Sequence, residues 1–427
     1  MKLMVVGGGG REHAIIRKLK ENPEVETVYA LPGNGGIASD AVCVPEIGAS
    51  DIASIVKFAQ EKEIDFAVVA PDDPLVLGAV DALEAVGVPC FGPRRDAAII
   101  EGSKVFSKNL MKKYGIPTAS YEVFTDMDKA LAYLETAPMP TVVKADGLAL
   151  GKGVMIARNL DEAREAVRTI MEDKKFGASG DRIVIEEFLT GPEVSVLSFT
   201  DGAVVVPMVS SMDHKRAFDG DKGPNTGGMG VVAPNPYYTP AVAKRCMEEI
   251  FRPTLHAMNA EGRTFRGCLY FGLMLTSEGP KVIEYNCRFG DPETQAVLPL
   301  LKTDLLTVMR ATANGTLSEL NVEWSDGAAA CVILASEGYP GSYEKGKTIT
   351  LPETLPDNVV IYHAGDKLSE DGGLVTSGGR VLGVTACAPN LPEALGGAYA
   401  AAEKIEFEGK RFRSDIGWLA LAAKGGQ

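Results

Sequence analysis

The chain has 427 residues, a formal net charge of −14 at pH 7, and 45% hydrophobic residues. This length is enough for about two to four domains with a sizeable core, and the composition is that of a folded globular protein, not a disordered one. The acidic charge disfavours non-specific binding to nucleic acid or to an anionic membrane, because both need clustered basic residues.

The cysteines and the first residues bear on the cellular compartment. Seven cysteines are scattered along the chain without a CxxC pair, so neither a zinc site nor a disulfide framework is indicated. The opening KLMVVGGGG is too short for a signal peptide, and no later stretch reaches the roughly 20 apolar residues that a membrane span needs. We therefore expect a cytoplasmic protein in a reducing environment.

The first hundred residues alternate between apolar runs typical of strands and helical patterns, which predicts an open parallel α/β sheet. Strands are expected at residues 2–6, 25–30, 65–70 and 86–91, and helices at residues 11–21, 51–62 and 74–86. The glycine- and proline-containing GPRRDAAIIEGS at 92–103 is expected to interrupt this pattern before a helix that ends at Gly115. We place a domain boundary close to Gly102.

The middle and the end of the chain differ in pattern. Residues 121–200 predict a compact α+β insert with the order strand, helix, strand, strand, helix, strand. Residues 213–236 lack periodicity and are expected to form a long loop, which is a frequent place for function. Further elements are a helix at 239–260, strands at 267–275 and 280–285, a helix at 293–313, and, after 327, the strands AAACVILAS, KTITL, NVVIYHAG and RVLGVTACA with a helix at 392–404.

These patterns indicate a multidomain protein of α/β and α+β class. We expect an N-terminal open parallel α/β domain at 1–101, a central domain at 102–326 with a small lid subdomain at about 122–187, and a small β-rich domain at 327–427.

Two glycine turns lie at the carboxyl edge of the N-terminal sheet, where open α/β sheets bind ligands. Gly7 to Gly10 follow the first strand and PGNGG at 32–36 follows the second. A helix N-terminus there could hold a phosphate, but Glu12 or His13 occupies the third glycine position of the dinucleotide fingerprint. Taken alone, the first turn could equally well be a tight turn that binds no ligand. The second turn beside it favours a phosphate pocket.

The central region offers groups for a nucleoside triphosphate without a Walker sequence. Lys144 ends a strand and precedes the glycine loop DGLALGKGV, and the later segment VIEEFLTGPEVS places backbone groups of Glu187 and Leu189 where an adenine edge could bind, with Glu193 near a ribose. Taken singly, Lys144 and the acidic segment read equally well as solvated surface.

The segment EYNCRFGDPET contains the candidate metal ligands. Glu284 and Asn286 are two residues apart on an expected strand, so both side chains share one face, and their oxygens suit Mg²⁺ beside phosphates. Tyr285 points to the opposite face. Arg288 offers a planar fork for a carboxylate or an acyl phosphate, and a structural ion pair between Glu284 and Arg288 is the alternative.

In this order, the segments resemble the ATP-grasp superfamily and, within it, the ligases that join glycine to 5-phosphoribosylamine. The resemblance spans essentially the whole chain and rests on GGGGREHA, GSKVFSKNLMKKYGIPT, VVKADGLALGKGV, VIEEFLTGPEVS, DHKRAFDGDKGPNTGGMG, EYNCRFGDPETQ, ASEGYPGSYEKG, TSGGRVLGVTA and FEGKRFRSDIG. It implies that the central domain has the ATP-grasp fold. PDDP at 71–74 departs from the family's Gly-Pro-Glu-Ala-Pro run, so Asp72 stands where the family has glutamate.

The resemblance implies a role for individual residues. ATP would be bound through Lys104, Lys144, Gly151, Gly153, Glu186, Glu187, Leu189 and Glu193; Mg²⁺ or Mn²⁺ through Glu284 and Asn286; and 5-phosphoribosylamine through Gly9, Gly10, Asn34 and Asp72. Arg288 would hold glycine and stabilise the acyl phosphate, while a loop bearing Asp213 and Lys215 closes over the reacting centre.

The implied reaction belongs to purine biosynthesis. The glycine carboxylate takes the γ-phosphoryl group of ATP to give glycyl phosphate and ADP, and the amine of 5-phosphoribosylamine then displaces phosphate to form glycinamide ribonucleotide. Such a transfer needs positioning and charge neutralisation more than a protein nucleophile. The partners implied are these small molecules, with a monomer expected and neither nucleic acid nor membrane.

Three rival interpretations remain at this stage. A carboxylase of the same superfamily would use bicarbonate in place of glycine, and a regulatory protein would keep the fold without chemistry. A dinucleotide-dependent oxidoreductase would depend on the Gly7 to Gly10 turn, whose third glycine is missing.

Overall fold

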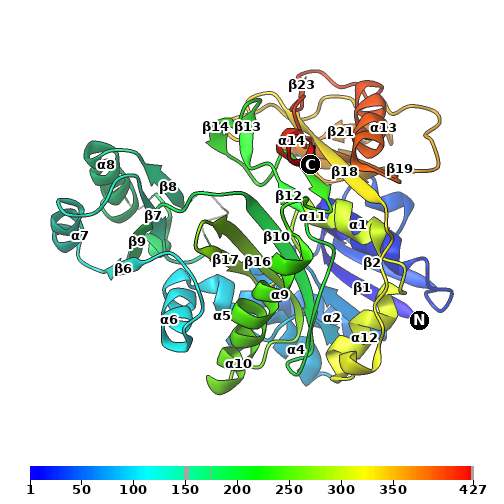
Figure 1. Cartoon of the computed structure of the whole chain (residues 1–427). Coiled ribbons are helices and arrows are strands. Elements are labelled where there is room, and N and C mark those ends of the chain that lie inside the picture. The colour runs from blue at the N-terminus through cyan, green and yellow to red at the C-terminus, as the bar shows by residue number, and fades with distance from the viewer. Residues whose placement is uncertain (149–152, 174, 425–427) are drawn as a thin grey trace.

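The computed structural model describes residues 1–148, 153–173 and 175–424. Figure 1 shows the N-terminal sheet in blue, a small unit in teal at the left, a central sheet in green and the C-terminal region in yellow to red at the top. No helix of the described residues is long and apolar enough to cross a membrane.

The N-terminal sheet has five parallel strands in the order β3-β2-β1-β4-β5. Its strands are β1 Lys2–Gly7, β2 Thr27–Pro32, β3 Val42–Cys43, β4 Phe66–Val69 and β5 Cys90–Phe91, and its helices are α1 Gly10–Leu19, α2 Ile52–Glu61, α3 Asp72–Leu77, α4 Ala79–Ala85 and α5 Arg95–Gly102. Four of the strands are those expected, and they are continuously apolar because helices cover the sheet.

Two expectations for this region were wrong. The helix expected at 74–86 is two helices, because Gly78 adopts a left-handed conformation with φ of 91° that ends α3 before α4 begins. Residues 92–103, expected as an interruption, contain α5, which begins only after Pro93 and buries Ala97, Ala98 and Ile100. The GP pair therefore precedes a helix and does not mark a long loop.

Helix α6, Lys104–Tyr114, begins and ends where the sequence predicts. The Ser103 hydroxyl accepts a 3.1 Å hydrogen bond from the Phe106 amide, which caps the first turn. Gly115 ends the helix in a left-handed conformation with φ of 67°. These caps place Lys104 at the start of the helix.

The small unit of residues 121–187 is an antiparallel sheet in the order β6-β9-β7-β8, with two helices and its own apolar core. Its elements are β6 Tyr121–Phe124, α7 Met127–Leu134, β7 Thr141–Ala145, β8 Val154–Ala157, α8 Leu160–Met171 and β9 Ile183–Glu187. The expected order of elements is confirmed. Strand β8 lies at the edge of the sheet.

The central sheet is antiparallel, in the order β11-β10-β16-β17, with α9, a π-helical turn and α10 packed nearby. The elements are β10 Glu193–Thr200, β11 Val205–Pro207, α9 Pro240–Cys246, the π turn Met247–Phe251, α10 Arg252–Ala260, β16 Gly267–Thr276 and β17 Gly279–Asn286. Strand β17 is an edge strand of this sheet, and at Val282 its outer edge bonds to the segment of Pro117 and Thr118.

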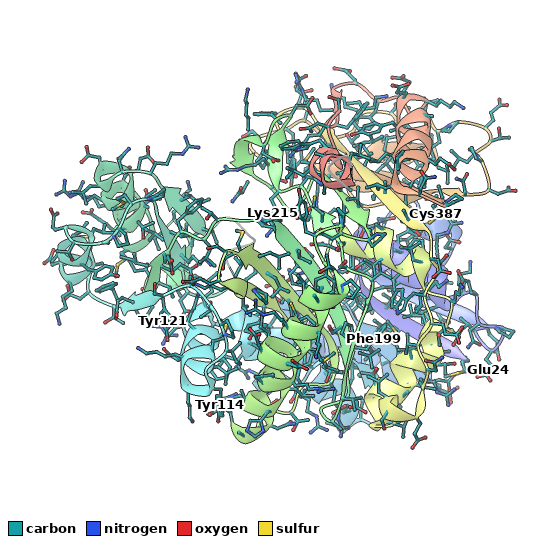
Figure 2. The ribbon with its side chains drawn as sticks, viewed as in Figure 1. Glu24, Tyr114, Tyr121, Phe199, Lys215 and Cys387 are labelled. Carbon is teal, nitrogen blue, oxygen red and sulfur yellow. The ribbon has the colours of Figure 1, made fainter. Side chains whose placement is uncertain are left out.

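Residues 213–236 are not the loop that the sequence predicts. They contain β12 Met212–Asp213, the hairpin of β13 Arg216–Phe218 and β14 Lys222–Asn225, and β15 Gly230–Ala233. Strands β12 and β15 extend the C-terminal sheet, whose order is β12-β15-β18-β22-β19 with β23 beside β18. The strands are too short to show a period-2 pattern, and their glycines and prolines mask them. Figure 2 labels Lys215 at the base of this hairpin.

The last part of the chain, from residue 293 onward, contains two helices followed by the remaining strands and helices. Its elements are α11 Glu293–Val297, α12 Leu305–Asn314, β18 Ala328–Ser336, β19 Val359–His363, β20 Asp366–Leu368, β21 Leu374–Thr376, β22 Arg380–Ala388, α13 Leu391–Glu403, β23 Lys410–Arg411 and α14 Trp418–Lys424. The expected strand KTITL forms only isolated bridges at Thr348 and Thr350, and the helix expected at 293–313 is interrupted between α11 and α12.

Candidate active site

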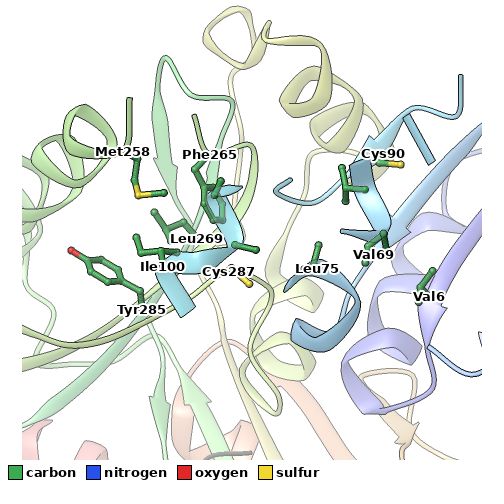
Figure 3. Packing of buried hydrophobic residues seen from close by; sticks show 14 of the residues in the cluster. Val6, Val69, Leu75, Cys90, Ile100, Met258, Phe265, Leu269, Tyr285 and Cys287 are labelled. Carbon is green, nitrogen blue, oxygen red and sulfur yellow. The ribbon is translucent and has the colours of Figure 1, made fainter. Parts of the chain in front are cut away.

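The site is built around Glu284 on β17. Glu284 pairs with Gly272 across the sheet, and the next residue, Tyr285, points to the opposite face and is buried. Figure 3 shows Tyr285 in the apolar core with Met258 and Leu269. This packing fixes the strand, so the alternation of side chains directs Glu284 away from the core.

Three lysines from different segments surround the Glu284 carboxylate. Lys215 Nζ lies 3.4 Å from Glu284 Oε1. Burial alone would raise the pKa of Glu284, but Lys215, then Lys144 and Lys104, outweigh this effect and lower it to about 2. Glu284 is therefore a permanently ionised oxygen donor in a positive environment, which suits a metal ion beside phosphates.

The lysines expected at the phosphates meet at the junction of the small sheet and β17. Lys144 Nζ pairs with Glu186 and donates to the Ile283 carbonyl at 3.3 Å, and Lys104 Nζ donates to the Gly147 carbonyl at 2.8 Å. Burial lowers the pKa of Lys104, which Glu284 partly opposes. Two cations thus lie beside the metal candidate.

Glu186 has a different environment from its neighbours in the segment. Its buried carboxylate pairs with both Lys144 and Lys108, so the side chain is already engaged in ion pairs within the protein. Glu187 ends β9, its carboxylate accepts from the Ser120 hydroxyl at 3.0 Å, and Leu189 follows the end of the strand. Glu193 begins β10, is half-exposed, and lies 3.6 Å from Lys215 Nζ.

Asn286 and Arg288 share one buried carboxylate. Glu101 Oε1 accepts from Asn286 Nδ2 at 2.8 Å and from the Arg288 guanidinium at 3.0 Å, and Glu101 Oε2 accepts from the Cys287 amide at 2.7 Å. Because Glu101 takes the nitrogen of the Asn286 amide, the Asn286 oxygen is directed elsewhere and is available to a metal. Arg288 also lies 3.8 Å from Asp72, and it pairs with these two acids and not with Glu284.

Asp213 lies near one acidic and two basic side chains, Glu293, Lys215 and Arg380. Burial, and then repulsion from Glu293, raises the pKa of Asp213 well above its usual value, although Lys215 opposes the shift. Glu293 Oε1 accepts from the Tyr270 hydroxyl at 3.0 Å. Gly228 packs tightly beside Asp213: a Cβ there would meet Asp213 Oδ1 at 2.6 Å.

The first glycine turn lies against the segment GDPETQ. A Cβ on Gly9 would meet Asp291, and one on Gly10 would lie 2.5 Å from Gln295 Nε2. The Gly9 amide donates to Glu12 at 2.7 Å, so this turn is partly closed by its own helix.

Asn34 and Gly153 serve the protein's own backbone. Asn34 Nδ2 donates to the carbonyls of Gly8 at 3.0 Å and His363 at 2.8 Å, and its oxygen accepts from the Ile37 amide at 2.8 Å. The side chain is thus fully used in joining the second turn to the C-terminal region. The Gly153 carbonyl accepts from Ala145 at 2.8 Å, and Gly151 lies outside the described residues.

Sequence reasoning missed Glu101, Lys108 and Arg380. Arg380 comes from β22 and donates to the Gly227 and Asp291 carbonyls at 2.8 Å each, which joins two segments of the site. Each of these residues lies far along the chain from its partners, so no local spacing indicates it. Glu101 follows an apolar run in α5 and Arg380 begins β22, whereas Lys108 is one of four lysines in α6 and nothing in the sequence distinguishes it.

The arrangement of lysines, carboxylate and amide at the junction of two antiparallel sheets defines an ATP-grasp ligase, a class that uses ATP with a divalent metal. A solved structure with the same fold at 18% identity is the biotin carboxylase domain of a 2-oxoglutarate carboxylase from Hydrogenobacter thermophilus, with a TM-score of 0.74 over 99% of this chain and 93% of that chain. That domain was solved in complex with MgADP, ADP and bicarbonate.

Three family models match the chain in succession. They are the phosphoribosylglycinamide synthetase N domain at residues 1–101, its ATP-grasp (A) domain at 102–294 and its C domain at 329–419. The chain belongs to the phosphoribosylglycinamide synthetase family.

Named relatives agree with this assignment. The chain is 49% identical to the phosphoribosylamine–glycine ligase of Caldanaerobacter subterraneus, over 97% of this chain and 99% of that protein. The crystal structure of the phosphoribosylamine–glycine ligase of Thermotoga maritima superposes with a TM-score of 0.85 at 37% identity, over 97% of this chain and 100% of that chain.

Proposed function

We propose that the chain joins glycine to 5-phosphoribosylamine at the expense of ATP, through glycyl phosphate, and so forms glycinamide ribonucleotide in purine biosynthesis. The observation that carries this proposal is the proximity of Lys104, Lys144 and Lys215 to Glu284, in a chain whose residues 1–294 and 329–419 match the family models. Similar cationic sites neutralise the charge that phosphoryl transfer redistributes.

ATP is bound between the small sheet and β17. Lys104 and Lys144 neutralise its phosphates, the backbone of Glu187 and Leu189 receives the adenine edge, and Glu193 accepts from the ribose. The ion pairs of Glu186 with Lys144 and Lys108 support an indirect role for Glu186, which orients Lys144. Gly153 and Gly151 belong to the loop that covers the phosphates.

Glu284 and Asn286 hold the divalent metal, Mg²⁺ or Mn²⁺. Both supply hard oxygens, the low pKa of Glu284 keeps its carboxylate ionised, and Glu101 orients the Asn286 amide. When bound, the metal neutralises the phosphate oxygens. Lys215, which pairs with Glu284, would supply a further positive charge beside the reacting phosphoryl group.

Arg288 holds the glycine carboxylate. Its Nε is buried and has no hydrogen-bond partner among the described residues. One N–H group of the guanidinium is therefore available to a substrate. Asp213 lies across the site and, with Lys215, closes over the reacting centre. The raised pKa of Asp213 supports this placement, because a substrate ammonium beside it would relieve the repulsion from Glu293.

5-Phosphoribosylamine is bound at the N-terminal edge. The backbone of Gly9 and Gly10 lies beside Asp291 and Gln295, and Asp72 lies near Arg288, so an amine held there would be close to the acyl group. Asn34 contributes by shaping the second turn, since its side-chain atoms are already bonded.

The proposal includes the division of the chain into domains. We place the domains at 1–101, 102–326 and 327–427 and the lid at about 122–187, supported by the separate core of that unit. The seven cysteines are free thiols, which supports a reducing cytoplasm.

A phosphate-release assay tests the proposal. Purified protein is incubated with ATP, Mg²⁺, glycine and freshly generated 5-phosphoribosylamine, and each component is omitted in turn. Phosphate release should require all four. Turnover with bicarbonate in place of glycine would favour a carboxylase instead, and absence of turnover with every substrate present would refute the proposal.

A further inference from the structure

Lys215 immediately precedes the hairpin of β13 and β14, and the position of this hairpin depends on the end of the chain. The C-terminal anchor, residues 413–417, crosses the hairpin about 195 residues later in sequence, as the bond from Ser414 to Asp219 shows. The anchor is not adjacent to ATP or to the metal candidates. Its role follows from the bonds that it makes.

The anchor bonds to each of the three turn residues of the hairpin. The Ser414 amide donates to Asp219 at 2.9 Å, the Gly220 amide donates to Asp415 at 2.8 Å, and the Arg413 guanidinium donates to Asp221 at 2.8 Å. A surface turn held at every residue cannot swing freely.

Arg413 is the centre of the anchor. It is 1% exposed, and its guanidinium forms a two-pronged pair with Asp415 at 2.7 and 2.9 Å. Its remaining donor bonds to the Arg216 carbonyl at 3.1 Å as well as to Asp221. A planar fork that reaches three partners is a geometry that lysine cannot reproduce.

The anchor also holds the other side of Lys215. The Gly417 amide donates to His214 Nε2 at 2.9 Å, and His214 Nδ1 bonds to the Gly230 carbonyl at 3.1 Å. The residues before and after Lys215 are therefore both fixed, and the Lys215 carbonyl accepts from the Thr226 amide at 2.7 Å.

We propose that Arg413 is a positioning residue, which holds the hairpin so that Lys215 Nζ stays within reach of Glu284 and the reacting phosphoryl group. The inference rests on the role proposed for Lys215. A catalytic lysine displaced by about 1 Å can cost on the order of 100-fold in rate, so loss of the anchor should lower kcat without removing the ATP site.

The test compares Arg413→Lys and Asp219→Ala with Arg411→Met. Arg411 lies in the same segment but is exposed and pairs with Glu337, away from the hairpin. Asp219 is exposed and accepts from the amide and the hydroxyl of Ser414, so its variant should fold even if the buried arginine variant does not. We expect kcat to fall by about 10- to 100-fold in the first two variants, with KM for ATP changed by less than about threefold, and no change in the control.

Two further measurements separate positioning from general destabilisation. Hydrogen exchange at the Thr226 amide should accelerate by at least about tenfold in both variants, while exchange in β22 stays as in the wild type. In a Lys215→Met background, Arg413→Lys should produce no additional loss of residual rate, because both changes remove the same contribution.

The proposal is overturned if both variants retain kcat within twofold despite faster exchange at Thr226. An equal loss of rate in the Lys215→Met background would overturn it too, because Arg413 would then act by another route. The exchange measurement needs no turnover, so wild-type protein that fails to ligate glycine would refute the proposed function and leave the anchoring contacts testable.

Discussion

Asn286 donates its side-chain amide to Glu101 across 185 positions of sequence, at 2.8 Å. One buried carboxylate thereby orients a metal-binding amide and, through its ion pair, Arg288. Glu101→Gln should weaken Mn²⁺ binding by about 10- to 100-fold and, because it leaves Arg288 with the more distant Asp72, 3.8 Å away, as its charge partner, lower the free energy of unfolding by about 2 kcal/mol. Calorimetric titration and chemical denaturation measure the two effects.

The matched control for Glu101 is Glu84→Gln. Glu84 also pairs with an arginine, Arg94, but this pair lies at the surface, where an ion pair contributes little. If the Glu101 variant binds Mn²⁺ as tightly as the control variant does, the orienting role is wrong.

Glu284→Ala should lower ATP-dependent turnover by more than about 100-fold and leave the fold intact, because an ionised metal ligand is lost from a partly open site. Phosphate release and the circular dichroism spectrum measure activity and fold. Glu278→Ala serves as the control, since Glu278 lies in the turn before the same strand and pairs only with Lys281 at the surface. Full activity in the Glu284 variant would remove the metal assignment.

Gly228→Ala should displace Asp213. Gly228 has a φ of 117°, and a Cβ there would overlap Pro292 and meet Asp213 Oδ1 at 2.6 Å. We expect kcat to fall by about tenfold or more, measured with saturating glycine. Gly262→Ala is the comparison, because it has a φ of 70° with open space around the added carbon, so it introduces only backbone strain. Equal kinetics in the two variants would show that Asp213 tolerates the displacement.

His214 should remain neutral at mildly acidic pH. Its burial, with Arg413 nearby, lowers the pKa to about 4, and Asp221 and Asp415 only partly oppose the shift. Because the unfolded state binds a proton below about pH 6.5 and the native state does not, stability should be complete above pH 6.5 and decrease as the pH falls toward 4. The loss from this group is about 3 kcal/mol at most, since one pKa unit corresponds to about 1.4 kcal/mol.

Proton NMR of the imidazoles measures this pKa directly, with the His214→Gln variant to assign the signal. The stability curve follows from chemical denaturation between pH 4 and pH 7. A His214 midpoint near 6.5 would contradict the prediction.

The small unit at 122–187 should close when ATP binds. ATP is expected to slow hydrogen exchange in β8, which is an edge strand and therefore lacks a neighbour on one side. Exchange in α13, which lies far along the chain in the C-terminal region, is the internal reference. Equal exchange in β8 with and without ATP would count against a lid.

The sequence predicts well what depends on local pattern. Ser103 and Gly115 mark the ends of α6, and the alternation around Tyr285 places Glu284 on the face that the lysines reach. Hydrogen-bonding caps and the two-residue period of a strand are properties of neighbouring residues, so they can be read without a structure.

What the sequence cannot provide is the pairing of distant charges. Arg288 was weighed as a partner of Glu284 because the two are four residues apart, yet it bonds to Glu101. Asn34 was expected at a substrate, but its amide joins two parts of the protein. The short strands β12 and β15 escape detection for a related reason, since β12 pairs with β15, and β15 pairs with β18, which lies about a hundred residues further along the chain.

The pairing of β15 with β18, and of β18 with β22, has a consequence for the order of events during synthesis. The segment that carries Lys215 leaves the ribosome long before Arg380–Ala388 of β22, the strand that completes its sheet. Domains generally fold as they emerge, but this segment must wait for distant partners. A growing chain can therefore fold its nucleotide-binding sheets early and still lack ATP-dependent activity until nearly all of it has been translated.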